Sequence, residues 1–321
     1  MFFTNKFQPQ GKFCYITGGS SGLGRALAAN LVQNGAHVTI VARDITRLAE
    51  TKALLRAVAV LGQESHCISA DLTSSTSSDA ALAEAMERNN GRVPDYVFLC
   101  AGFARPKFFV DASSEELQSG FDGTYWVSAW TAHAAVKKMV SHRTRGSIIF
   151  VSSFVGYTSF AGYSTYSPGK YALRGLADTL RSEMLLHHIS VHIFMPAGID
   201  SAGYIAENVE KPEITKKIEE GDQVISPEEC AKHLIRGLER GYYQPTDYLL
   251  TDLVRMQSRG AVPGNNLLLD TMHWVVSGVG VPIWRMITDA QVKRYRGSVA
   301  ADLEARGFYQ SEANRKGSTD I

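Results

Sequence analysis

The stretch Phe13-Cys-Tyr-Ile-Thr17, followed at once by Gly18-Gly-Ser-Ser-Gly22-Leu-Gly24, predicts how the chain begins to fold. Residues 13–17 indicate a short buried strand. The apolar spacing of residues 26–34 indicates a helix that ends at Gly35. Residues 37–43 then have the composition of a second strand. A strand, a glycine turn, a helix and a second strand form a unit whose helix N-terminus can hold the pyrophosphate of a dinucleotide. The alternative is a glycine turn without a ligand.

The rest of the chain repeats this alternation of strands and helices. Because parallel strands joined by helices form a doubly wound sheet, we expect a single Rossmann-type α/β/α domain with ligands at the carboxyl ends of the strands. The polar segment 73–80 is predicted to be a loop, and a further helix is expected to carry Tyr166 and Lys170. The other predicted strands are 66–72, 95–102, 148–153 and 190–196, and the other predicted helices are 45–61, 80–89 and 113–141.

Composition narrows the class of protein. The chain has 321 residues, a net charge of +1 and 45% hydrophobic residues, which is typical of a globular domain and gives no sign of a nucleic-acid partner. The four cysteines are widely spaced, which favours buried thiols over disulfides or a metal site. The first ten residues are too short and too polar for a secretory signal peptide.

Ser153, Tyr166 and Lys170 form a candidate catalytic group. Tyr166 and Lys170 are four residues apart, so on a helix they share one face. A nearby cation favours the phenolate and would bring the phenol pKa, normally near 10, toward the working range. Ser153 ends the apolar run 148–153 and could hold a carbonyl oxygen while Tyr166 delivers a proton. By itself, a tyrosine four residues before a lysine could equally be a solvated pair.

The end of the second predicted strand points to NADP(H). An acid at that position would bind the ribose 2′-hydroxyl of NAD, whereas an arginine can bind a 2′-phosphate. Here the strand ends in Arg43, with Arg47 one turn further on. Asp44 would weaken this preference if it turned inward, and Arg47 has the alternative of being a solvated helix charge.

Together these motifs resemble the short-chain dehydrogenases/reductases over about residues 10–260. The resemblance implies that Ser153, Tyr166 and Lys170 are catalytic, that Asp71 lies near the adenine, and that Ser201 holds the nicotinamide amide. The cofactor-binding residues that it implies are Thr17, Gly18, Ser20, Ser21, Gly22, Leu23, Gly24, Arg43, Arg47, Asp71, Leu72, Ala101, Gly102, Tyr166, Lys170, Pro196, Gly198, Ile199 and Ser201.

Two positions depart from the family pattern. The family motif Asn-Asn-Ala-Gly is replaced by Leu99-Cys100-Ala101-Gly102, which we expect to change sheet packing more than chemistry. The asparagine of the family's catalytic tetrad falls on Thr124, which would then have to hold the water that relays protons to Lys170. A threonine hydroxyl can hold water, but its reach is shorter.

Within the family, the chain resembles the fungal group of 3-ketodihydrosphingosine reductases. The features that support this are the arginine after the second strand, the stretch Tyr204-Ile-Ala-Glu207-Asn208 and a C-terminal extension. The resemblance implies NADPH-dependent reduction of a long-chain sphingoid-base ketone at the cytosolic face of the endoplasmic reticulum, by a dimer or tetramer. The alternatives are a steroid or retinoid ketone as substrate, or a non-catalytic NADP(H)-binding scaffold.

Two segments outside the nucleotide-binding pattern have predicted roles. Residues 197–225 mix apolar and charged side chains, as in a lid over an apolar site, and Glu207 could face the substrate ammonium. Residues 267–287 approach membrane-spanning length but contain Asp270, Pro282 and Arg285, so we expect them to dip into a membrane or to be buried in an oligomer. The domain then covers 1–260, the extension 261–306, and a disordered tail 307–321.

Overall fold

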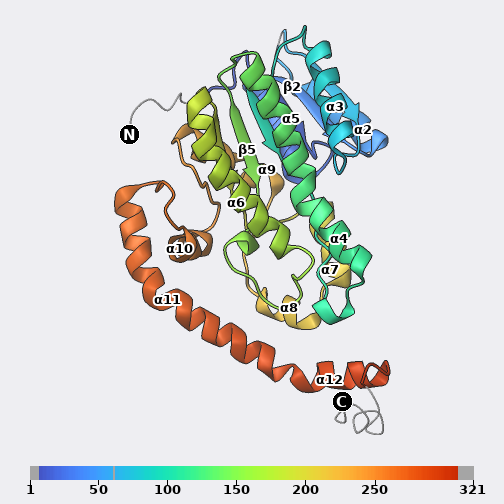
Figure 1. Cartoon of the computed structure of the whole chain (residues 1–321), viewed down its shortest axis with the longest axis vertical. Coiled ribbons are helices and arrows are strands. Elements are labelled where there is room, and N and C mark those ends of the chain that lie inside the picture. Colours follow the sequence, from blue (N-terminus) through green and yellow to red (C-terminus); the bar gives the residue numbers. More distant parts are fainter. Residues whose placement is uncertain (1–6, 61, 310–321) are drawn as a thin grey trace, which may run out of the picture.

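The computed structural model describes residues 7–60 and 62–309. Its centre is a six-stranded, all-parallel sheet with the strand order β3-β2-β1-β4-β5-β6 (Figure 1). This is the order of a doubly wound nucleotide-binding fold, so the predicted fold class is confirmed. The strands are β1 (Phe13–Thr17), β2 (His37–Ala42), β3 (Ser65–Ser69), β4 (Tyr96–Leu99), β5 (Ser147–Val151) and β6 (Ser190–Phe194).

Helices cover both faces of the sheet. One face packs against α1 (Gly22–Gln33), α2 (Ile45–Val58) and α9 (Pro227–Glu239). The other packs against α3 (Ser75–Arg88), α5 (Val127–Ser141) and α6 (Ser167–Met184), and Figure 1 shows α5 and α6 in front of the sheet. Central strands such as β1 are buried on both faces, which explains their continuous apolar runs. Short helical turns lie at η1 (Phe109–Asp111), η3 (Phe154–Gly156) and η4 (Leu185–His187).

One predicted boundary is wrong, and one predicted helix contains an unexpected π-helical turn. Residues 73–80 are not all loop, because α3 begins at Ser75 and Ser74 caps it through the amide of Ser77. The serines and threonines of its first turns hide the helical spacing. The predicted helix 113–141 is helical from Ser114 to Ser141, but its middle is a π-helical turn. It consists of α4 (Ser114–Phe121), a π-helical turn (Asp122–Trp126) and α5.

The connection 197–225 is more regular than the sequence indicated. It contains β7 (Gly198–Ile199), α7 (Ala202–Glu210), α8 (Glu213–Ile218) and β8 (Val224–Ile225), and β7 pairs with β8. The two helices are too short and too charged for their periodicity to stand out. Apolar side chains such as Ile205 and Val209 remain exposed on α7.

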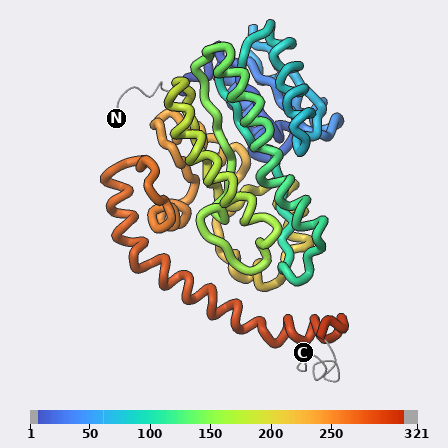
Figure 2. Tube along the Cα trace, in the orientation of Figure 1, coloured from blue at the N-terminus to red at the C-terminus, as the bar shows by residue number. Residues whose placement is uncertain are grey.

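The C-terminal extension is helical. It comprises α11 (Leu267–Arg294) and α12 (Arg296–Ala305), and it follows α10 (Leu249–Ser258), the last helix of the domain. Figures 1 and 2 show α11 leaving α10 and running past α8 toward α12. The helical stretch Leu267–Ala305 is long and apolar enough to cross a membrane by length and composition alone, because it contains an 18-residue window with a mean hydropathy of 1.2. The predicted disordered tail lies mostly outside the described residues, which end at 309.

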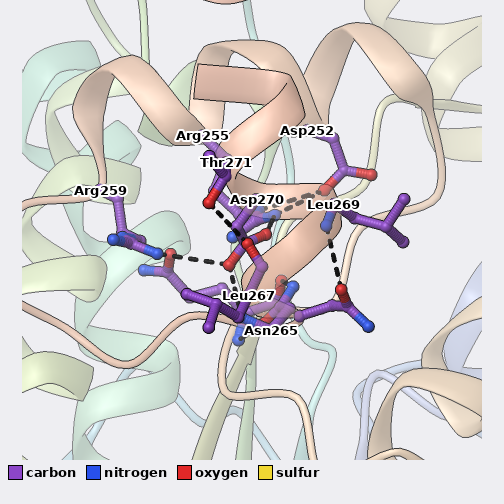
Figure 3. A network of polar contacts seen from close by, with 10 residues as sticks. Asp252, Arg255, Arg259, Asn265, Leu267, Leu269, Asp270 and Thr271 are labelled. Carbon is purple, nitrogen blue, oxygen red and sulfur yellow. Dashed lines mark hydrogen bonds and ion pairs between the residues drawn. The ribbon is translucent and has the colours of Figure 1, made fainter. Parts of the chain in front are cut away.

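An ion cluster fixes the start of α11 to α10 (Figure 3). Arg255 is 1% exposed, and its Nη2 lies 2.6 Å from Oδ1 of Asp270 and 3.0 Å from Oδ1 of Asp252. Arg259 and the backbone amide of Asn265 contact the other carboxylate oxygen of Asp270 at 3.3 and 2.8 Å. Buried charges require such partners, so this cluster sets where α11 leaves the domain.

Candidate active site

Ser153, Tyr166 and Lys170 meet at the carboxyl end of β5. Ser153 follows β5 and accepts a hydrogen bond from the amide of Val155 at 3.4 Å, while Tyr166 is the N-cap residue of α6. The Tyr166 hydroxyl faces the side chain of Ser153, which acts on the tyrosine pKa as a hydrogen-bonding partner. Lys170 lies in the first turn of α6, with its Nζ 5.4 Å from the centre of the Tyr166 ring. The three residues predicted to be catalytic are therefore neighbours.

Lys170 is held in a water-poor position. Lys170 is only 4% exposed, and its Nζ donates a hydrogen bond to the carbonyl oxygen of Val151 at 3.0 Å. Burial lowers the pKa of Lys170 to about 8, while the nearby Cys100 opposes that shift. An amine with a pKa near neutrality can gain and lose a proton during turnover, as a proton relay requires.

The pKa of Tyr166 differs from the expectation. Removal from water and, next, the carboxylate of Glu207 raise its pKa, and the hydrogen bond with Ser153 only partly offsets this. The expected net lowering by Lys170 is therefore wrong for this arrangement, because the lysine faces the ring and bonds to Val151. A raised pKa keeps the phenol protonated, which is the form that donates a proton to a carbonyl oxygen.

Thr124 lies in the π-helical turn that faces α6. Its hydroxyl donates to the carbonyl oxygen of Gly120 at 2.7 Å, and the residue is fully buried. A Cβ on Gly169 would lie 1.8 Å from the Thr124 oxygen, so only glycine fits there, directly before Lys170. Because its proton is bonded to Gly120, Thr124 could only accept a hydrogen bond from a relay water. Such π turns are frequent at functional sites.

The glycine turn after β1 has the shape that a pyrophosphate needs. Gly18 has a φ of +67°, and a Cβ there would lie 2.9 Å from the backbone of Ala101. A Cβ on Gly24 would lie 2.4 Å from the Gly18 oxygen, so α1 packs tightly against the turn. Within the described residues, the hydroxyl of the N-cap residue Ser21 makes no capping bond to the α1 amides. The chain therefore leaves a helix N-terminus open to an anion.

The structure also gives the surroundings of the residues that were predicted to bind the adenosine half of the cofactor. Asp44 caps α2 by accepting from the amide of Arg47 at 3.0 Å, so its carboxylate is engaged by the helix and does not turn inward. The Arg47 side chain pairs with Asp44 at 3.5 Å. Arg43 is exposed, and in the described part of the chain its guanidinium takes part in no ion pair. The hydrogen bond from the Thr73 amide lowers the pKa of Asp71.

Several other residues that were predicted to bind the cofactor make contacts within the fold itself. The Thr17 hydroxyl accepts from the amide of Ala101 at 3.1 Å and so joins the ends of β1 and β4. The Pro196 carbonyl accepts from the amide of Phe154 at 2.8 Å. Gly198 and Ile199 form β7, and the hydroxyl of Ser201 caps α7. Gly102 lies near Lys170, whereas Leu23 and Leu72 are buried in the two core layers.

A cavity of about 800 Å³ opens at the glycine turn. Ser20, Ser21, Gly22, Arg47 and Ser201 are part of its wall. It continues along α1, α2 and α9, away from Tyr166, so only its mouth coincides with the candidate cofactor site. The close approach of Gly22 to Ser201, where a Cβ would lie 3.3 Å from the serine side chain, brings the turn and the lid together.

Sequence reasoning missed one group of residues near the site. Lys211, between α7 and α8, is bonded to both Glu207 and Glu219, and Tyr163 contacts the same two acids. The carboxylate of Glu207 does not stand free, because Lys211 and Tyr163 already contact it, and its role toward a substrate ammonium stays a prediction. The partners lie up to 56 residues apart in sequence, so no local pattern could reveal them.

The comparisons with known proteins agree with this geometry. Residues 12–212 match the short chain dehydrogenase family, and the chain belongs to that family. Family membership indicates a nicotinamide cofactor. Solved structures share the fold. A short chain dehydrogenase/reductase from Burkholderia phymatum has a TM-score of 0.69 at 20% identity and covers 79% of this chain and 95% of its own.

Sequence relatives carry a more specific name. The chain is 56% identical to a 3-ketodihydrosphingosine reductase of Cryptococcus neoformans over 310 residues, or 97% of this chain and 92% of the relative. It is 36% identical to a 3-ketodihydrosphingosine reductase of Aspergillus fumigatus, over 85% of this chain and 82% of the relative. A protein of Dictyostelium discoideum with the same name is 33% identical, with 80% of each chain covered.

Proposed function

We propose that this protein is an NADPH-dependent reductase that converts 3-ketodihydrosphingosine to dihydrosphingosine in sphingolipid synthesis. The observation that carries the proposal is the 56% identity to the Cryptococcus neoformans reductase over nearly the whole chain. The neighbouring positions of Ser153, Tyr166 and Lys170 support it, because they suit proton delivery to a ketone.

Each of the three residues then has a role. Ser153 orients the ketone oxygen, Tyr166 gives its hydroxyl proton to that oxygen, and Lys170 returns a proton toward Tyr166. Bound NADPH supplies the hydride that adds to the carbonyl carbon, so the ketone becomes a secondary alcohol. Thr124 holds Gly169 and the first turn of α6 in place, next to Lys170.

The preference for NADPH over NADH is part of the proposal. Arg43 stands exposed at the end of β2, and Asp44, the competing acid, is engaged as the cap of α2. An exposed guanidinium whose neighbouring acid Asp44 is engaged by a helix cap suits a 2′-phosphate. The amides at the N-terminus of α1 suit the pyrophosphate.

A lipid substrate also requires a route from a membrane. The outer side of α11 exposes large apolar side chains, including 60% of Trp274 and 71% of Met286, while Trp284 packs on Phe154, the residue after Ser153, at 6.1 Å. We place α11 at the cytosolic surface of the endoplasmic reticulum, with α7 and α8 as the lid of the site. Assembly into a dimer or tetramer belongs to the same proposal.

The test uses the purified full-length chain with NADPH and 3-ketodihydrosphingosine. Oxidation of NADPH should accompany formation of the 3-hydroxy base, identified by mass spectrometry. A steroid ketone and retinal serve as comparison substrates. Faster reduction of either would refute the substrate assignment, and no cofactor turnover with any ketone would favour the scaffold alternative.

A further inference from the structure

Lys211 is a buried lysine at the joint between α7 and α8. Its side chain is 0% exposed, and its Nζ lies 2.9 Å from Oε1 of Glu207 and 2.5 Å from Oε2 of Glu219. Lysine is almost never fully buried unless it is paired. Since Glu207 belongs to α7 and Glu219 follows α8, the ammonium ties the two lid helices together.

Tyr163 connects this ion cluster to the reaction centre. Its hydroxyl lies 2.7 Å from Oε1 of Glu207 and also contacts Glu219. Its ring centre is 5.9 Å from that of Tyr166, and its carbonyl oxygen accepts from the amides of Tyr166 and Ser167 at 3.1 and 2.9 Å. A movement of the lid that displaces Tyr163 would therefore also move the start of α6.

A second contact joins the lid to the same loop. The Thr215 hydroxyl in α8 donates to the carbonyl oxygen of Ala161 at 2.8 Å. Gly162 has a φ of +97°, and a Cβ there would lie 2.1 Å from the Thr215 oxygen, so no side chain fits between the loop and α8. The loop before Tyr166 is thus packed directly against the lid.

The charges of the cluster also act on Tyr166. The groups that face it are Lys170 on α6, Ser153 after β5, Tyr163 in the preceding loop and Glu207 on α7. Glu219, Lys211 and the exposed Asp222 form the outer part of the cluster. After burial, Glu207 is the largest influence that raises the pKa of Tyr166. The ammonium of Lys211 opposes that carboxylate at 2.9 Å.

We propose that Lys211 and Glu207 are positioning residues for Tyr166. Through Tyr163 they hold α7 and α8 against the loop before α6, and their opposite charges set the electrostatic environment of the Tyr166 hydroxyl. This inference rests on the ketone reduction proposed above. Loss of Lys211 exposes Tyr166 to an unscreened carboxylate, whereas loss of the Glu207 charge removes that influence. The two substitutions loosen the same cluster but change the charge beside Tyr166 in opposite directions.

The kinetic test is the pH dependence of the reverse reaction, dihydrosphingosine with NADP⁺, because there Tyr166 must be deprotonated to act. Lys211→Met should move the midpoint of the acid limb of kcat upward by at least about 0.5 pH unit, and Glu207→Gln should move it downward by a similar amount. Lys211→Arg should restore the wild-type midpoint. Lys170 is present in every variant, so its titration is common to all. Lys216→Met is the matched control, because within residues 7–60 and 62–309 Lys216 pairs only with the exposed Glu213, at 3.0 Å on α8.

Limited trypsin digestion gives a readout that does not need activity. Cleavage after Lys216 and Lys217 should be several-fold faster in Lys211→Met than in the wild type or in Lys211→Arg, because the lid is released. Unshifted midpoints, midpoints that move in the same direction, or unchanged cleavage would overturn the inference. If Lys211→Met does not fold, Glu207→Gln tests the inference alone. A downward shift of its acid-limb midpoint supports the inference, and an unshifted midpoint refutes it. A wild-type protein that does not act on the sphingoid base refutes the proposed function instead, and the digestion still tests the lid contact.

Discussion

The carboxylate of Asp270 lies 2.6 Å from the guanidinium of Arg255, and the two side chains are only 6% and 2% exposed. Asp270 lies in the first turn of α11 and Arg255 belongs to α10, so this pair connects the C-terminal extension to the domain. Burial acts to raise the pKa of Asp270, but the hydrogen bond and the charge of Arg255 outweigh it and hold that pKa below its usual value. Asp270, a charged residue within the apolar segment 267–287, therefore has a structural role, because it attaches α11 to α10.

Asp270→Ala should lower the free energy of unfolding by about 3 kcal/mol, because it leaves the buried Arg255 without its main partner. Urea unfolding measures the loss, and Glu213→Ala, which removes an exposed pair, should cost less than about 0.5 kcal/mol. Since the folded pKa of Asp270 is depressed, its contribution is present above the unfolded pKa of about 3.9 and is lost as the pH falls through the folded value. Equal losses in the two variants would contradict this account.

Tyr166→Phe removes the proton donor and keeps the ring. We expect turnover of 3-ketodihydrosphingosine to fall by about two orders of magnitude or more, with NADPH binding retained. Steady-state kinetics and NADPH fluorescence measure the two effects separately. Tyr171→Phe is the control, because Tyr171 is 41% exposed on the same helix and should cost far less. Near-normal turnover in Tyr166→Phe would refute the proton-donor role.

The pH dependence of ketone reduction should reflect Lys170. Burial lowers its pKa to about 8, so the ammonium that relays protons is present below that pH and is lost as the pH rises through it. The rate of reduction should therefore decline above pH 8. In Lys170→Arg, whose guanidinium does not lose its proton, any residual rate should decline only at higher pH. An alkaline limb that stays at the same pH in this variant would assign it to another group.

The parts of the fold that were predictable are those with local causes. The glycine turn, the buried strands and the spacing of Tyr166 and Lys170 each follow from a few adjacent residues, and they place Ser153, Tyr166 and Lys170 correctly together. The lid was predicted as a connection but not as helices, because α7 and α8 have only nine and six residues. The partners of Glu207 come from distant segments, and their pairing depends on the tertiary fold.

Arg43→Ala should weaken NADPH binding by about 10- to 100-fold and leave NADH binding almost unchanged, because a guanidinium–phosphate hydrogen bond is charge-assisted. Titration calorimetry with each cofactor gives both dissociation constants. Arg47→Ala is the control, since Arg47 already pairs with Asp44 at 3.5 Å and should contribute less. If both cofactors weaken equally in Arg43→Ala, the arginine supports the fold, and Ser20 or Ser21 becomes the candidate for contacting the 2′-phosphate.

The substrate tail should follow the apolar path that begins beside the reaction centre. Trp284 of α11 packs on Phe154 at a ring distance of 6.1 Å, and the exposed apolar side chains of α11 continue from there. Each buried methylene contributes about 0.8 kcal/mol, or about fourfold in affinity, so the apparent affinity for 3-keto-sphingoid bases should rise steeply with chain length.

Trp284→Ala should flatten that dependence on chain length, because it removes the part of α11 that contacts Phe154. Trp274→Ala is the matched control, since Trp274 is 60% exposed on the same helix and should affect binding to lipid vesicles more than chain-length selectivity. The KM of a series of synthetic 3-keto bases, measured in a fixed detergent, separates the two outcomes. A dependence that stays equally steep in Trp284→Ala would place the tail elsewhere, and a chain-length series without any trend would contradict an apolar channel altogether.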